Sequence, residues 1–173
     1  MKTKDLALSA MFTAFIAVCS YIQIPTPLVP FTLQVFAISL TAMMLSFKQA
    51  SFAIVSYVLL GLIGLPVFAG GVSGPQAILS PSFGFILGFI PMTLTINKVY
   101  HRLEGPKRVV ALLCGELILY VIALPILYLN LKNFLNITLD MKTLFVSYFL
   151  IFIPTDTLSM GISYYISEKI NRN

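Results

Sequence analysis

Two acidic residues, Glu116 and Asp156, lie inside long apolar stretches of this 173-residue chain. A carboxylate near the centre of a bilayer costs on the order of 2.5–3.5 kcal/mol on insertion scales, so such residues usually face a cavity or a substrate path. Asp156 also follows Pro154, and proline typically begins or interrupts a helix. We therefore expect Asp156 to contact a small ligand; the alternative is that it caps a helix N-terminus. For Glu116, a ligand role and a structural role are equally open.

Other chemistry is excluded by what the sequence lacks. There is no G-x-x-x-x-G-K-[ST] phosphate loop, so the chain does not bind ATP in that way. The single histidine, His101, has no partner for a catalytic triad or a zinc site, and Cys19 and Cys114 are too few for a zinc cage. We expect neither an enzyme nor a metal or cofactor site.

The apolar stretches indicate an integral membrane protein, since 58% of residues are hydrophobic and only 10% are charged. Their lengths suit helices that cross a bilayer, with no room for a soluble domain. We predict a single all-α domain over residues 1–173 with six transmembrane helices. Their expected ranges are 5–21, 31–47, 50–66, 81–99, 109–131 and 141–167, the last divided at Pro154.

The positive charges predict the orientation of these helices. Nine Lys and Arg residues lie on the side that holds both termini, and only Lys132 and Lys142 lie opposite. By the positive-inside rule, both termini are then cytoplasmic. The net charge of +5 therefore reflects topology and contact with the lipid bilayer, and no nucleic acid partner is needed to explain it.

The uncharged stretch from Gly64 to Phe89 holds six of the ten glycines and three of the ten prolines. This composition predicts irregular backbone among membrane spans. Irregular backbone at that depth survives only where protein buries it or where it lines a cavity, so we expect this outward-facing loop to form one wall of a ligand site. The segment 23–34, with three prolines, is predicted to be a stiff extended connection.

Uncharged polar side chains add candidates for ligand contact. Gln34, Gln76 and Tyr120 offer neutral hydrogen-bonding groups, although each also suits helix packing. In the first span, Ala7, Ala10 and Ala14 share one face, and small residues at this spacing let another helix approach closely. This face could dock a partner or pack internally.

Four groups of residues in register resemble the BioY family, the biotin-binding S components of energy-coupling factor (ECF) transporters. They are Pro30-Phe31-Thr32-Leu33-Gln34, Ala69-Gly70-Gly71-x-x-Gly74-Pro75 with Pro81-x-x-Gly84-x-x-x-Gly88-Phe89, Gly115-Glu116-x-x-x-Tyr120, and Phe152-Ile153-Pro154-x-Asp156. The resemblance covers nearly the whole chain. It implies an S-component fold in a prokaryotic plasma membrane.

The resemblance also implies a function and partners. The chain would bind biotin in an outward pocket under its first and third external loops. It would then deliver biotin inward when docked, through Ala10 and Ala14, on a transmembrane coupling subunit that carries two ATPase subunits.

One departure from the family pattern affects the expected site. The sixth-span motif usually carries a lysine where this chain has Ser159. The carboxylate of biotin then needs other donors, for which we expect the backbone amides of Gly70, Gly71 and Gly74 with help from the Ser159 hydroxyl.

The remaining expected contacts divide by chemistry. We expect the ureido head to contact polar groups and the rest of the ligand to meet apolar walls. The polar groups are Asp156, Gln34, Gln76 and Tyr120, and the walls include Phe31, Phe68 and Phe83. The alternatives are an S component for a different vitamin or biotin analogue, a non-transport membrane scaffold, and a carrier that works without partners.

Overall fold

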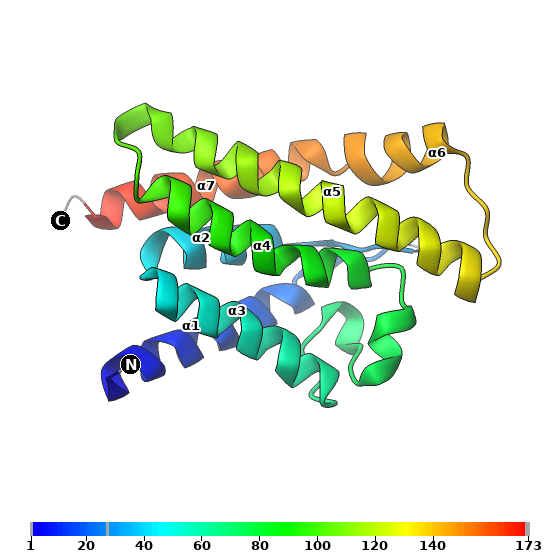
Figure 1. The fold of residues 1–173 in the computed structure, drawn as a ribbon, viewed down its shortest axis with the longest axis horizontal. Helices are drawn as coiled ribbons and strands as arrows, with labels where there is room; N and C mark the ends of the chain where they lie inside the picture. The colour runs from blue at the N-terminus through cyan, green and yellow to red at the C-terminus, as the bar shows by residue number, and fades with distance from the viewer. Residues whose placement is uncertain (1, 27, 172–173) are drawn as a thin grey trace.

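The computed structural model describes residues 2–26 and 28–171 as a bundle of helices (Figure 1). The helices are α1 (Thr3–Tyr21), α2 (Gln34–Met44), α3 (Phe47–Leu62), α4 (Phe83–Tyr100), α5 (Val109–Phe134), α6 (Met141–Phe145) and α7 (Ile153–Asn171). Short turns η1 (Ala69–Gly71), η2 (Pro75–Leu79), η3 (Gly105–Arg108) and η4 (Val146–Leu150) lie between them, with two short strands, β1 (Gln23–Ile24) and β2 (Phe31–Thr32).

Four helical segments in the described part of the chain are long and apolar enough to cross a membrane: 3–21, 83–100, 105–134 and 141–170. α2 and α3 are apolar but shorter. At about 1.5 Å per residue, α2 rises only roughly 16 Å, about half of a bilayer core. The predominantly helical membrane fold is therefore confirmed, whereas six full-length spans stay a prediction.

The two ends of the proline-rich connection are extended, and they pair with each other. β1 and β2 run antiparallel, with Gln23 opposite Thr32 and Ile24 opposite Phe31. The expected helix start at residue 31 is wrong, because α2 begins at Gln34. Pro30 cannot donate to a helix and disfavours helical backbone in the residue before it, so the helix begins only after this proline.

The turn between α2 and α3 lies at Leu45–Ser46, not at the predicted Lys48–Gln49 break, since α3 already begins at Phe47. Ser46 is the N-cap of α3, and its backbone N–H donates to Gln49 Oε1 at 3.0 Å. Asn97 of α4 donates to the carbonyl oxygens of Ala42 and Leu45 at 2.7 and 2.8 Å. This amide satisfies carbonyl acceptors at the end of α2, where the helix has no N–H donors of its own to supply.

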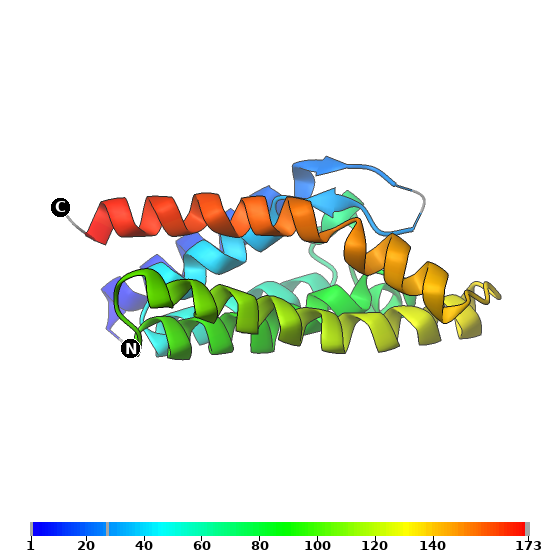
Figure 2. The same ribbon diagram turned by 90° about the horizontal axis from the view of Figure 1, so that it is seen from above.

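α4 and α5 pack closely along their length because glycines line their contact. A Cβ on Gly84 would lie 2.5 Å from the carbonyl oxygen of Ala123, and one on Gly88 would lie 2.8 Å from Leu119 Cδ1. Small residues allow this close approach of membrane helices. The pair forms one side of the bundle, seen along the lower edge of Figure 2.

The start of α1, the end of α7, the α2–α3 turn and the α4–α5 linker lie at one end of the molecule (Figure 1). There, Arg108 forms an ion pair with Glu168 at 2.6 Å, and Tyr100 donates to the same Glu168 Oε1 at 2.8 Å. These contacts join α4, the start of α5 and α7. The glycine-rich loop and the α5–α6 connection lie at the opposite end.

The last helical segment is interrupted, as its proline predicts. α6 continues into η4, a π-helical turn, and α7 begins at Ile153 with Pro154 in its first turn. Figure 2 shows α6 running at an angle to α7. The missing N–H of Pro154 costs nothing at a helix start, so the break can occur here and place Asp156 in the first turn of α7.

Candidate functional site

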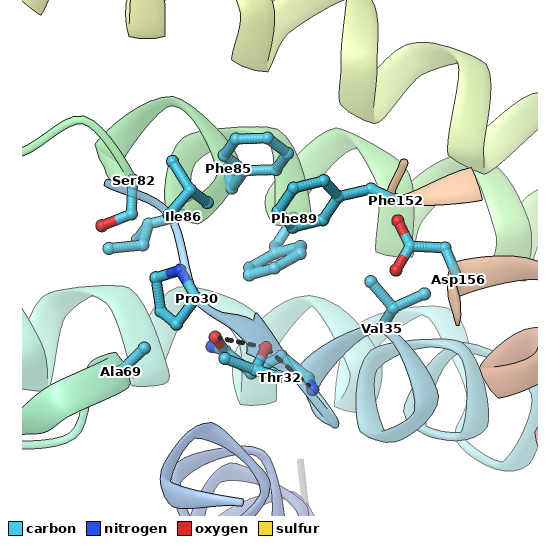
Figure 3. Close-up of a pocket in the computed structure, with 12 residues that line it drawn as sticks. Pro30, Thr32, Val35, Ala69, Ser82, Phe85, Ile86, Phe89, Phe152 and Asp156 are labelled. Atoms are coloured by element: carbon cyan, nitrogen blue, oxygen red, sulfur yellow. Dashed lines mark hydrogen bonds between the residues drawn. The ribbon is translucent and has the colours of Figure 1, made fainter. Parts of the chain in front are cut away.

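A cavity opens between the hairpin, the start of α2, the N-terminal half of α4 and the start of α7 (Figure 3). Its empty space is about 500 Å³ when the open mouth is included. Its lining residues are Val29, Pro30, Thr32, Gln34, Val35, Ala69, Ser82, Phe85, Ile86, Phe89, Phe152 and Asp156. Two of the predicted ligand contacts, Gln34 and Asp156, are therefore part of one cavity.

Asp156 forms one end of this cavity. Its carboxylate accepts a hydrogen bond from the Tyr120 hydroxyl at 2.5 Å, and only 6% of the residue is exposed. The backbone N–H of Asp156 donates to the Phe152 carbonyl at 3.0 Å, so the residue belongs to the regular helix. Tyr120 therefore fixes the direction of the carboxylate and leaves its remaining lone pairs for a donor in the cavity.

Aromatic rings form the middle of the cavity. Phe85 and Phe89 are four residues apart on α4, so they share the face that points toward α7. The rings of Phe85 and Phe152 stack with centroids 6.1 Å apart. Phe31 stacks on the ring of Phe152, with centroids 4.1 Å apart. Such walls suit a flat or apolar ring system.

Ser82 lies at the end of the cavity opposite Asp156 (Figure 3). It is the N-cap residue of α4, and its hydroxyl lies 3.2 Å from that of Ser80. Asn130 of α5 donates to the carbonyls of Ile78 and Ser80 at 2.8 Å each, which holds this loop in place. The N–H groups of Phe83 and Phe85 already donate to the carbonyls of Ser80 and Ser82, so the dipole of α4 and the Ser82 hydroxyl are what favour a negatively charged group at this end.

The Gln34 side chain occupies the floor of the cavity. Its Nε2 donates to the Tyr57 hydroxyl at 2.6 Å, and its Oε1 accepts from the Thr32 hydroxyl at 3.1 Å (Figure 3). These two bonds use the oxygen and one N–H of the amide. The second N–H can donate to an acceptor in the cavity.

The glycine-rich loop covers the site, but its predicted amides do not line the cavity. The N–H of Gly71 donates to the Phe68 carbonyl at 3.0 Å, and that of Gly74 donates to the Gly61 carbonyl at 2.7 Å. Gly70 is exposed, as is Gln76. Among the described residues, the loop residue that lines the cavity is Ala69. Two of the three amides expected to bind a carboxylate are thus already used by the backbone.

Four other predicted contacts lie behind the lining. Tyr120 donates a hydrogen bond to the lining residue Asp156, and Phe31 stacks on the lining residue Phe152. Phe68 is buried against α3, where a Cβ on Gly61 would lie 2.0 Å from its ring. Phe83, the first residue of α4, is also buried outside the lining.

Ser159 is buried one turn of α7 below Asp156 and does not line the cavity. Glu116 is also buried, one turn of α5 before Tyr120, and its Oε1 has no hydrogen-bond partner among the described residues. The structure therefore places a second carboxylate near Asp156, outside the cavity lining.

The small residues of α1 point outward and are not used in internal packing. Ala7, Ala10 and Ala14 are exposed, and Ala10 and Ala14 line an apolar groove between α1 and α3. We call this the α1–α3 groove; it is lined by Ala10, Thr13, Ala14, Ala17, Val18, Phe52, Ser56, Tyr57, Leu59, Leu60, Ile63 and Val67.

Sequence reasoning missed several lining residues that carry a recognisable signal. Phe85 and Phe89 repeat at helical spacing inside the motif that ends at Phe89, and Phe152 lies four residues before Asp156 on the same helix face. Ser82 precedes α4 as helix caps commonly do. No comparable signal singles out Val35 or Ile86.

Comparison with known proteins agrees with this geometry. The profile of the BioY family matches residues 1–173. A relative from Lysinibacillus sphaericus, named "Probable biotin transporter BioY", is 35% identical over 171 residues, covering 97% of this chain and 87% of the relative. A relative of the same name from Pyrococcus horikoshii is 32% identical over 173 residues, covering 100% of this chain and 99% of its own length.

A solved structure, the S-component for biotin from an ECF-type ABC transporter, matches with a TM-score of 0.75. The match covers 99% of this chain and 93% of the other, at 24% identity, so it establishes the fold. The chain is thus a multi-pass protein of the prokaryotic plasma membrane, with relatives named as transporters and not as enzymes. By sequence over its whole length, the chain belongs to the BioY family.

Proposed function

We propose that this chain is the substrate-capture component of an ECF-type vitamin transporter and that it binds biotin in the cavity between α2, α4 and α7. The observation that carries the proposal is the cavity itself, with Asp156 at one end and aromatic walls in its middle, in a member of the BioY family. A mostly apolar pocket with a few placed polar groups suits a small bicyclic ligand.

The proposed pose follows from the chemistry of biotin. Its ureido group presents N–H donors and one carbonyl acceptor. Asp156 accepts from an N–H, and the free N–H of Gln34 donates to the carbonyl. The fused rings lie between Phe85, Phe89 and Phe152, which line the same cavity.

The valerate chain then extends toward Ser82, and its carboxylate meets the N-terminus of α4. In this pose, the Ser82 hydroxyl and the N-terminus of α4 take the role of the lysine that the family pattern carries at the position of Ser159. Both favour an anion. The amides of Gly71 and Gly74, which we expected in this role, already donate to backbone carbonyls.

We place both termini in the cytoplasm and the cavity on the outer side, with α2 and α3 as short spans that complete six crossings. The support is the charge distribution in the sequence: nine Lys and Arg residues fall in or beside the two terminal segments, the α2–α3 turn and the α4–α5 linker. The described parts of these segments lie at one end of the molecule (Figure 1).

Transport then requires partners. The chain lacks a phosphate loop, so energy comes from two ATPase subunits joined through a transmembrane coupling subunit. The exposed Ala10 and Ala14 allow a helix of the coupling subunit to pack on α1.

Calorimetry on the purified protein in detergent tests the substrate. We expect biotin to bind with a Kd below about 1 μM, or −8.2 kcal/mol at 25 °C. Thiamine and riboflavin are the comparison ligands and should release no heat. Binding of another vitamin in place of biotin would overturn the substrate but keep the class, and binding of none would favour a scaffold role.

A further inference from the structure

One buried hydrogen bond crosses from the ligand cavity to the other half of the bundle. It joins Gln34 Nε2, on the cavity floor at the start of α2, to the hydroxyl of Tyr57 on α3, at 2.6 Å. Tyr57 is fully buried and does not line the cavity; it lines the α1–α3 groove on the far side. The two residues thus lie back to back, and this bond joins the cavity floor to α3.

The Gln34 amide is held at both ends. Thr32, in strand β2, bonds to the other end of the amide at 3.1 Å, and the backbone N–H of Gln34 donates to the same hydroxyl at 3.3 Å. The dashed lines in Figure 3 mark these bonds. A glutamine side chain has several rotatable bonds and loses considerable entropy when ordered, so partners at both ends reduce what a ligand must order on binding.

Tyr57 can serve as a partner of fixed position because its side chain is fully buried among packed residues. Phe68 packs edge-on against it with ring centroids 5.5 Å apart. Phe68 is in turn confined above Gly61, where a Cβ would lie 2.0 Å from its ring. The Ser20 hydroxyl of α1 donates to the Val67 carbonyl at 2.8 Å and holds the adjoining segment.

We propose that Tyr57 is a positioning residue for the ligand: it holds the Gln34 amide in the direction that presents a free N–H to the cavity. Tyr57 contributes to ligand binding without touching the ligand, and it acts only through Gln34. The inference rests on the proposed function, because it takes the cavity as the binding site of a vitamin with a hydrogen-bond acceptor.

A double-mutant cycle tests the inference with Tyr57→Phe and Gln34→Met, which keep side-chain volume and remove the hydrogen bond. One neutral hydrogen bond contributes about 0.5–1.5 kcal/mol, so Tyr57→Phe should weaken ligand affinity roughly 2- to 13-fold. In the Gln34→Met background, the same Tyr57→Phe change should alter affinity by less than about 2-fold, because the bond is already absent.

The ligand in the cycle is whichever vitamin binds the wild-type protein, so a failure of biotin overturns the proposed function and leaves this test in place. Tyr128→Phe is the matched control, since Tyr128 lies on α5 away from this network and should bind ligand as the wild type does. An equal loss from Tyr57→Phe in both backgrounds would show that Tyr57 acts through packing and would overturn the inference. So would unchanged affinity of the Tyr57→Phe single variant.

Discussion

At the scale of single residues, the site depends on how Asp156 is held. An isolated carboxylate on a membrane helix is costly, but Tyr120 supplies a hydrogen bond at 2.5 Å and the start of α7 supplies a favourable helix dipole. Asp156 is the fourth residue of α7 and not its N-cap, so of the predicted capping role only the favourable helix dipole applies, and this is compatible with the predicted ligand role. The same position in the first turn of α7 aims the carboxylate at the cavity.

Removing the Tyr120 hydroxyl should loosen this carboxylate. A hydrogen bond to a charged group contributes about 1.5–3 kcal/mol, so we expect Tyr120→Phe to weaken biotin binding by roughly 10-fold or more. Calorimetry would measure the change. Tyr165→Phe, at an exposed position on α7, is the control and should bind biotin with wild-type affinity. Equal affinity of the Tyr120→Phe and wild-type proteins would contradict the proposed role of the pair.

Residue types alone identified two residues of the cavity lining, Gln34 and Asp156, and missed most of the apolar lining. Asp156 and Gln34 stand out because polar groups are rare in apolar stretches, and such rarity is visible in a sequence. The aromatic walls carry a weaker signal: Phe85 and Phe89 share a helix face by their spacing, but they are two of 14 phenylalanines in the chain. The amides of Gly71 and Gly74 could not be excluded either, because backbone hydrogen bonding depends on the folded loop.

At the scale of elements, the apolar stretches predicted the helices well and their ends less well. Hydrophobicity fixes which segments lie in the bundle, whereas the ends depend on tertiary partners. The end of α2 is held by Asn97, which lies 52 residues after Leu45 in sequence. The hairpin of β1 and β2 was not predicted, because two-residue strands carry no periodicity that a sequence can reveal.

The α4–α5 contact gives a direct test of element packing. We expect Gly84→Ala to destabilise the protein by about 1–3 kcal/mol, because the new methyl group would overlap the Ala123 backbone. Thermal unfolding in detergent would measure the loss as a lower Tm.

Gly161→Ala is the matched control on α7. A Cβ there would meet nothing within 4 Å, and alanine is the better helix former by roughly 0.5–1 kcal/mol. Its Tm should equal or exceed that of the wild type. A Gly84→Ala protein as stable as the Gly161→Ala protein would contradict the close packing of α4 on α5.

At the scale of the whole molecule, the proposed ligand site and the proposed docking surface lie on different faces of the bundle. The ligand cavity lies between α2, α4 and α7, whereas the α1–α3 groove faces outward on the other half. A change at an exposed position of α1, away from the Tyr57–Gln34 hydrogen bond, should therefore leave the cavity intact.

Ala14→Phe tests this separation. A large ring on the exposed face of α1 should block close helix packing, so uptake of labelled biotin by cells that express the full transporter should fall by more than about 10-fold. Biotin affinity of the purified protein should stay unchanged. Met11→Phe, at an exposed α1 position outside the groove lining, is the control and should retain uptake. Normal uptake by the Ala14→Phe variant would contradict docking through this face.

The claim that biotin binds at Asp156 is tested most directly by the affinity of Asp156→Asn for biotin. This change keeps the shape of the side chain and removes the charge that accepts the ureido N–H. Truncating a buried, hydrogen-bonded charge costs about 2–5 kcal/mol, so affinity should fall by roughly 30-fold or more. Asp140→Asn, at the exposed N-cap of α6, should bind as the wild type does. An Asp156→Asn protein that binds biotin with wild-type affinity would contradict the account.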